Sequence, residues 1–308
     1  MATKTNVTTS AQFTTSAREV DFVSRFADNW DALRNIMGIM RPIRKAPGTK
    51  LVSYKASVDG VLKGGVVAEG DEIPFTKMKV EPVAYGDIDI SKYAKSVTIE
   101  SVAKYGADVA VEKTDEAFLV ALQNKVLTDF YTFLGTGTLK LTEKTWQRAL
   151  AMAKGKVLEK FAGLDKDVTE VVGFANIIDA YDYLGDKEIT VQTMFGLNYV
   201  ENFMGYRTLF LLPEKYIKAK TVIALPVENI DLYYVDPSDS DFAKLGLNYT
   251  VKGETNLIGV HVDGDYSRAT GDMYAIMGMK LWAEYLDGIA VATVQAAATD
   301  ASKAAATA

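Results

Sequence analysis

The sequence offers few side chains that could carry out covalent or metal chemistry. Cysteine is absent, and His261 is the only histidine among the 308 residues. Without cysteine the chain has no disulfide, no thiolate nucleophile and no cysteine zinc site. One histidine cannot form a three-histidine zinc site, and a serine triad through His261 would lack the GxSxG turn that presents the serine. The composition therefore excludes most familiar catalytic sites.

Motifs for phosphate and calcium binding are missing or imperfect. The chain has no GxxxxGK followed by serine or threonine, and no GxGxxG between a strand and a helix. Residues 263–267 begin like a calcium-binding loop, but Arg268 and Tyr274 stand where such a loop needs glycine and glutamate. A polar turn between two strands is the better interpretation. We predict no catalytic residue, no cofactor and no bound metal.

Charge and hydropathy describe an ordinary globular chain. Hydrophobic residues make up 48% and charged residues 24%, and 34 basic against 40 acidic side chains give a net charge of −6. The length predicts about two compact units. An acidic surface repels nucleic acid, which excludes a broad DNA- or RNA-binding face. The longest uncharged apolar run, Gly288–Thr299, is shorter than the roughly 20 residues of a membrane span. We expect a soluble protein without membrane contact.

Hydrophobic spacing predicts helices and strands in a mixed order. Apolar residues at helical intervals predict helices over 18–37 and 108–134, with Asp108 or Thr114 as alternative caps of the second. Two further helices are expected at about 142–161 and 176–184. The expected strands are 168–174, 208–212, 221–225, 229–235, 256–263 and 272–285. This order predicts an α+β fold in which strands from the front and back of the chain pair.

Residues 50–99, between the first two helices, predict a long β-hairpin. Polar and apolar side chains alternate there, and the tip at 59–71 contains four glycines. The hairpin is too polar to bury both of its faces, and an isolated two-stranded ribbon is only marginally stable in water. It must therefore lie on another surface, either of its own chain or of a neighbouring one.

Charged side chains concentrate near the tip of this hairpin. The basic residues Lys63 and Lys77 lie close in sequence to the acidic residues Glu69, Asp71 and Glu72. Such a mixture occurs on any solvated surface, but it would also suit an electrostatic contact with another copy of the chain. These five residues are the candidate subunit-interface site.

The order of arm, long hairpin, long helix and mixed second part resembles the major capsid proteins of tailed bacteriophages, which have the HK97 fold. Residues 65–74, GVVAEGDEIP, resemble the glycine, acidic and proline run in the extended loop of that family. Residues 221–237, TVIALPVENIDLYYVDP, resemble its axial-domain segment. The resemblance covers roughly residues 18–294 and rests more on the order of elements than on single residues.

The resemblance implies an α+β, HK97-like capsid fold whose extended loop lies over the adjacent subunit. Its parts would be an N-terminal arm with a helix (1–49), the extended loop (50–97), a peripheral domain with a long spine helix (98–139), an axial domain (140–255), return strands of the peripheral domain (256–294) and a flexible C-terminal tail (295–308). A loop placed over a neighbour would meet the packing need inferred for the hairpin.

The resemblance also implies a structural protein and not an enzyme. Copies of the chain would form the hexamers and pentamers of an icosahedral virion capsid, assembled in the cytoplasm of a host bacterium. A separate scaffolding protein and a portal would be partners, and double-stranded DNA would be enclosed without sequence-specific binding. Two alternatives stay open: the shell of an encapsulin-like cellular nanocompartment, and an α+β enzyme. An enzyme would give a small defined oligomer in light scattering, whereas a shell protein would give capsomers or megadalton particles.

Overall fold

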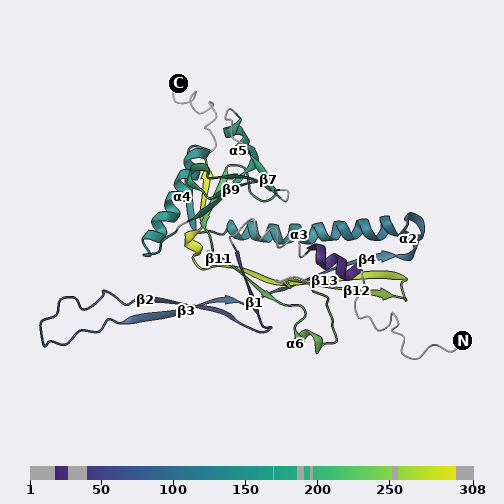
Figure 1. Cartoon of the computed structure of the whole chain (residues 1–308), viewed down its shortest axis with the longest axis horizontal. Helices are drawn as coiled ribbons and strands as arrows, with labels where there is room; N and C mark the ends of the chain where they lie inside the picture. The colour runs from purple at the N-terminus through teal and green to yellow at the C-terminus, as the bar shows by residue number, and fades with distance from the viewer. Residues whose placement is uncertain are drawn as a thin grey trace, which may run out of the picture.

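The computed structural model describes residues 18–26, 40–168, 170–185, 191–194, 197–251 and 256–295. Figure 1 shows an elongated molecule in which a long helix and one sheet run along the length, while a second sheet with α4 and α5 rises near one end. A thin ribbon, β2 and β3, projects beyond that end. The predicted arm (1–17) and C-terminal tail from residue 296 onward lie outside the described residues. The predicted helix 18–37 is helical over 18–26, and its remainder lies outside them too.

The lengthwise sheet has five strands built around β13 (Thr270–Ala283). This strand is long enough, at 14 residues, to pair with three others. Its antiparallel partners are β12 (Ile258–Asp265), β4 (Ile90–Thr98) and β11 (Ile230–Val235), and β1 (Met40–Lys45) pairs parallel with β11. The turn between β12 and β13 forms one end of the molecule, next to α2 (Ile99–Tyr105) (Figure 1).

The predicted long helix covers one side of this sheet. It begins before Thr114, which was one of its two predicted N-caps. A π-helical turn, η2 (Asp108–Glu112), continues directly into α3 (Lys113–Leu134), and Gly135 ends the helix as predicted. Thr114 does not cap a helix start, because its hydroxyl donates to the carbonyl oxygens of Ala110 and Val111. The helix therefore starts near Asp108, the other alternative considered.

The second sheet has seven strands and lies between two helical layers. Its order is β5 (Leu139–Glu143), β14 (Ala290–Val294), β10 (Thr221–Pro226), β6 (Val171–Asn176), β9 (Thr208–Leu212), β8 (Leu197–Glu201) and β7 (Gln192–Met194). The helix α4 (Trp146–Ala162) packs on one face through the buried residues Leu150, Ala153 and Val157. The shorter elements are α5 (Ile177–Leu184), α6 (Ser240–Ala243), η3 (Phe203–Gly205) and η4 (Leu286–Gly288).

Two cores share the seven-stranded sheet. Along β10, Val222 and Ala224 join the core beneath α4, whereas Ile223 and Leu225 join the larger core around α3 and the five-stranded sheet. This alternation is what a strand buried on both faces produces. No helix within the described ranges has both the length and the apolar character of a membrane span.

Three strands pair outside the parts predicted for them. β4 was expected in the loop hairpin (50–97) but pairs with β13. β11 was expected in the axial domain (140–255), yet it lies in the five-stranded sheet. β14 was expected to return to the peripheral domain with residues 256–294, but it pairs with β10 and β5. Local spacing does not contain partners that lie far away in the sequence, such as β13 for β4 or β5 for β14, so the two sheets cross the predicted boundaries.

Candidate assembly interface

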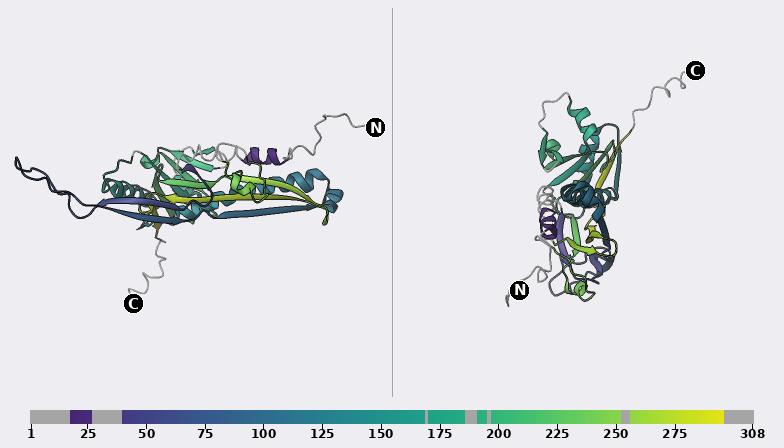
Figure 2. Two further views of the ribbon diagram at one scale, coloured as in Figure 1. Left: turned by 90° about the horizontal axis from the view of Figure 1, so that it is seen from below. Right: turned by 90° about the vertical axis from the view of Figure 1, so that its right-hand side faces the viewer.

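The hairpin formed by β2 (Leu51–Val58) and β3 (Met78–Gly86) stands apart from both sheets. The two strands pair antiparallel with each other from Val58 opposite Met78 to Leu51 opposite Gly86, and neither strand has another partner in the described sheets. Figure 2 shows the hairpin leaving the body as a thin ribbon with nothing beside its outer half. A two-stranded ribbon of this kind is marginally stable alone. The structure therefore confirms the hairpin over 51–86 and shows that the other described residues leave its outer half uncovered.

The tip of the ribbon, residues 59–77, exposes several large apolar side chains. We call them the tip apolar patch: Val61, Leu62, Val66, Ile73 and Phe75. Phe75 is 88% exposed and Val61 is 82% exposed. Single exposed apolar residues are ordinary, but a group confined to a projecting segment is typical of an interaction site.

The five predicted charged residues all lie at this tip. Neither lysine forms an ion pair with Glu69, Asp71 or Glu72 in the described structure. The Lys77 ammonium pairs with Asp59 at 2.9 Å, and the backbone N–H of Lys63 donates to the Thr76 hydroxyl at 2.9 Å. Glu69, Asp71 and Glu72 are exposed and form no ion pair within the described residues. Three acidic side chains are therefore free to meet a partner.

The base of the ribbon is fixed to the five-stranded sheet. The ring of Tyr85 packs on Trp282 with centroids 4.4 Å apart. The Lys280 ammonium donates to the carbonyl oxygen of Asp87 at 2.8 Å. Gly86 has a φ of +78°, and a side chain at that position would start 3.1 Å from the same ammonium. These contacts aim the ribbon away from the body of the molecule.

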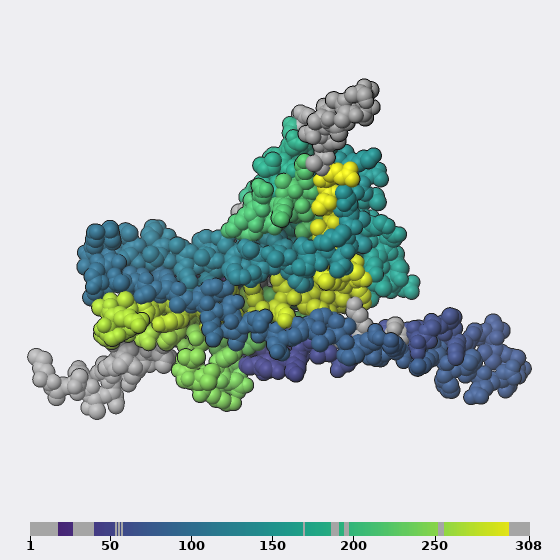
Figure 3. All heavy atoms as spheres, turned by 180° about the vertical axis from the view of Figure 1, so that it is seen from behind, coloured from purple at the N-terminus to yellow at the C-terminus, as the bar shows by residue number. Residues whose placement is uncertain are grey.

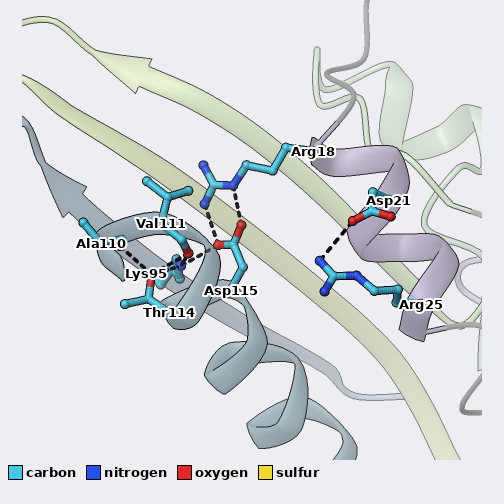
Figure 4. Close-up of polar contacts among 8 residues, drawn as sticks. All are labelled: Arg18, Asp21, Arg25, Lys95, Ala110, Val111, Thr114 and Asp115. Atoms are coloured by element: carbon cyan, nitrogen blue, oxygen red, sulfur yellow. Dashed lines mark hydrogen bonds and ion pairs between the residues drawn. The ribbon is translucent and has the colours of Figure 1, made fainter. Parts of the chain in front are cut away.

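A polar cluster near the N-terminal end of α3 joins three segments that are distant in the sequence (Figure 4). The carboxylate of Asp115, on the first turn of α3, accepts hydrogen bonds from Arg18 of the N-terminal helical segment, with Nη2 to Oδ1 at 2.6 Å, and from Lys95 of β4, with Nζ to Oδ1 at 2.5 Å. Only 4% of the Asp115 side chain is exposed. We call these three residues the Asp115 cluster.

The Asp115 cluster also holds the π-helical turn. The Lys95 ammonium contacts the hydroxyl of Thr114 and the carbonyl oxygen of Val111, the latter at 3.5 Å. Sequence reasoning missed this cluster, although a signal was present. Asp115 lies four residues before Leu119, on the buried face of the helix, and a charged residue on such a face needs a partner.

We expect the Asp115 cluster to make stability depend on pH in acid. Burial opposes the charge of the Asp115 carboxylate, but the hydrogen bonds from Arg18 and Lys95 overcome it and lower the pKa of Asp115 below its ordinary value. Since the folded-state pKa is lowered, the cluster stabilises the fold above the unfolded-state pKa of about 3.9 and loses this contribution as pH falls through the folded-state value.

The measurement is the free energy of unfolding of the unaltered protein and of Asp115→Asn from neutral pH into acid. The difference between them should be constant at neutral pH and shrink below about pH 4. The matched control, Asp129→Asn, removes a partly exposed carboxylate of the same helix and should show a small difference throughout. A difference for Asp115→Asn that grows in acid would contradict the assignment.

The described residues contain no group of three or more histidine, aspartate or glutamate side chains placed to hold a metal ion. His261 lies in β12, where its ring packs edge-on against the ring of Tyr249, with the two ring centroids 6.3 Å apart. The calcium-like run covers the end of β12 and the start of the polar turn into β13, where Asp265 accepts hydrogen bonds from the backbone N–H and the hydroxyl of Ser267.

Comparison with protein-family models and with curated proteins finds no match. Solved structures do match over most of the chain. The match to the capsid structure of cyanophage P-SCSP1u covers 84% of this chain and 86% of the capsid chain, at 8% sequence identity and a TM-score of 0.57. The mature capsid of bacteriophage PhiM1 matches 85% and 87%, at 7% identity and a TM-score of 0.54. The SrpI encapsulin from Synechococcus elongatus PCC 7942 matches 86% and 91%, at 10% identity and a TM-score of 0.50.

Proposed function

From the α+β HK97-like capsid fold, which these likenesses confirm, we propose that the chain is a structural shell protein without enzymatic activity that assembles with copies of itself. The observation that carries the proposal is the ribbon of β2 and β3. Its base packs on the five-stranded sheet, it exposes the tip apolar patch, and the other residues that the structure describes leave its outer half uncovered. A neighbouring copy would bury that patch and supply the surface that the ribbon lacks.

Within this proposal, we place the shell around the double-stranded DNA of a tailed phage, built from hexamers and pentamers. The two phage capsids give TM-scores of 0.57 and 0.54, above the 0.50 of the encapsulin. The net charge of −6 also suits a container, because an acidic wall does not retain packaged DNA. A separate scaffolding protein and a portal belong to this proposal, as does a location in the virion. A nanocompartment shell is the second candidate, since the encapsulin has the same fold.

The test is to express the full chain and examine it by light scattering and negative-stain electron microscopy, alone and in lysate from phage-infected cells. Closed particles or hexameric and pentameric rings are the expected result. A stable monomer, or an oligomer smaller than a pentamer, both alone and in the lysate would overturn the shell proposal. Particles that close without viral proteins and enclose a host enzyme would support the nanocompartment over the virion.

Charge reversal at the tip is expected to impair assembly and leave the fold intact. Changing Glu69, Asp71 and Glu72 to lysine should alter the free energy of unfolding by no more than about 0.5 kcal/mol, because all three are exposed and unpaired in the described structure. Complementary charges steer association, so particle yield should fall strongly. Electron microscopy measures the yield and denaturant unfolding measures the stability.

The matched control for this prediction reverses three exposed acidic residues elsewhere: Asp167, Glu201 and Glu214. It changes the net charge by the same amount, so a loss of particles in both variants would indicate a general charge effect. Normal assembly of the tip variant would show that these carboxylates do not lie in an assembly contact.

A further inference from the structure

The strand β1 is the outermost strand of the five-stranded sheet in the described part of the chain. Its one partner in the described sheets is β11, with which it pairs in parallel from Met40 opposite Ile230 to Lys45 opposite Val235. Its sequence, MRPIRK, suits an edge strand, because proline has no N–H to offer a further strand and basic side chains discourage one. In the sequence, β1 lies between the N-terminal helical segment and the ribbon.

Few apolar side chains hold β1 in place. Met40 is its one buried residue, and Ile43 is half-buried. The N-terminal helical segment differs, since Phe22, Val23 and Phe26 are each no more than 3% exposed and belong to the larger core. Burial of apolar surface is the dominant favourable contribution to folding, so β1 depends on other contacts.

Charged contacts take the place of apolar packing in β1. The Arg41 guanidinium donates to Asp231 of β11, with Nε to Oδ1 at 2.9 Å. The Arg44 guanidinium pairs with Asp236, the residue directly after β11, with Nη2 to Oδ2 at 3.3 Å. The two carboxylates are buried, with 6% and 2% of their side chains exposed, whereas the two arginines are about half-exposed. The attachment of β1 is therefore mainly electrostatic.

Arginine is concentrated in this part of the sequence. Five of the eight arginines lie within the first 45 residues, whereas the lysines are spread along the whole chain. A guanidinium offers several N–H donors in one plane and is common where two separate surfaces meet through ion pairs. The third basic residue of the strand, Lys45, lies 5.1 Å from the centre of the Tyr233 ring of β11. All three basic side chains of β1 thus contact β11 or the residue after it.

We propose that β1 is a releasable strap, which leaves and rejoins the edge of β11 while both sheets stay folded. An edge position, little apolar burial and half-exposed ion pairs are typical of elements that open locally at a lower free energy than the whole fold. The inference goes beyond the proposed function, because it concerns a single copy and does not require a shell.

The position of the strap links its release to the ribbon. A turn closed by the N–H of Thr49 and the carbonyl oxygen of Ala46, at 3.2 Å, joins β1 to β2. Figure 3 shows the ribbon leaving the body at its lower border. Release of the strap would remove the support on the β2 side of the ribbon and leave the contact of Tyr85 with Trp282 on the β3 side. The ribbon would then be free to change its angle to the body.

Hydrogen exchange followed by mass spectrometry tests the strap in the full chain, with β13 as a reference in the same sample. After correction for intrinsic rates, the slowly exchanging amides of residues 40–45 should exchange about tenfold or more faster than those of residues 278–283, where β13 pairs with β11. Added salt should widen the difference, since it screens half-exposed ion pairs. Equal rates for the two strands would overturn the proposal.

A double variant tests whether charge holds the strap. Arg41→Gln with Arg44→Gln should speed exchange in β1 by about tenfold or more and leave β13 unchanged. The matched control, Arg148→Gln with Arg207→Gln, removes two exposed arginines that pair with glutamates near the seven-stranded sheet, and it changes the net charge equally. It should leave β1 unchanged. Equal acceleration of β1 and β13, or no acceleration of either, would contradict a charge-held strap.

A disulfide gives a measurement in the opposite direction. Ile43 and Tyr233 lie opposite each other in the register, and the chain has no cysteine, so Ile43→Cys with Tyr233→Cys can form one disulfide between β1 and β11. Oxidation should slow exchange in β1 to about the rate of β13 and also slow the first residues of β2, and reduction should reverse both effects. If β1 exchanged as fast in the oxidised protein as in the reduced one, its exchange would not come from release, and the strap would be overturned.

Discussion

Shortening the ribbon to a two-residue turn should abolish assembly and leave a folded subunit. Val58 lies opposite Met78 in the ribbon, so replacing residues 59–77 by Asn-Gly joins β2 and β3 through a type I′ turn in the native register. The tip apolar patch is lost from the contact between copies. Burial of a single Leu, Ile or Phe side chain is worth about 1.5–3 kcal/mol, so if only two of the five patch residues are buried in the contact, their loss weakens it by roughly a hundredfold or more.

Light scattering and electron microscopy measure this loss, and circular dichroism with denaturant unfolding checks the fold. The matched control is Leu245→Ser, which removes a side chain that is 73% exposed but distant from the ribbon in sequence. It should assemble normally. If the shortened chain formed particles with ordinary yield, the ribbon would be dispensable and the shell proposal would lose its main support.

Replacing Asp115 by Asn should cause the largest loss of stability among the polar substitutions considered. The change leaves the Lys95 ammonium, only 12% exposed, and the Arg18 guanidinium without their carboxylate. Removing one member of a buried ion pair typically costs about 3–5 kcal/mol, and the lower end applies because 28% of Arg18 is exposed. Denaturant unfolding at neutral pH measures the loss.

Two comparisons make this second prediction specific. Asp129→Asn removes an exposed partner of Lys125 on the same helix and should cost about 0.5 kcal/mol or less. Adding Lys95→Met to Asp115→Asn should recover part of the lost stability, because the buried charge is then gone. A cost for Asp115→Asn equal to that of Asp129→Asn would mean that the cluster does not tie the N-terminal helical segment to α3.

The elements with strong local patterns were predictable from the sequence. The buried stripe at Leu119, Leu122, Val126 and Phe130 defined the long helix, and the alternation after residue 50 defined the ribbon. The order of these elements was enough to predict the fold. The polarity of the hairpin also predicted that it needs another surface, whereas the role of its charged tip residues in a contact between copies stays a prediction.

Other features depended on contacts that local spacing does not contain. Residues 290–294 were expected among the return strands, but their partners β10 and β5 lie about 70 and 150 residues earlier, so local spacing could not place β14 in the seven-stranded sheet. The β4 segment showed the same alternation as the ribbon, and only β13 distinguishes it.

The central position of β13 has a consequence for synthesis in the cell. Three strands of the five-stranded sheet, β4, β11 and β12, can pair with β13 only after residues 270–283 have been synthesised. In the other sheet, β5 can pair with β14 only after residues 290–294 have been synthesised. A nascent chain on the ribosome has therefore translated its ribbon long before either sheet can close. Truncated products would carry the exposed apolar tip without the sheet that anchors the ribbon, so an interrupted translation yields material for proteolysis and not a subunit that could join an assembly.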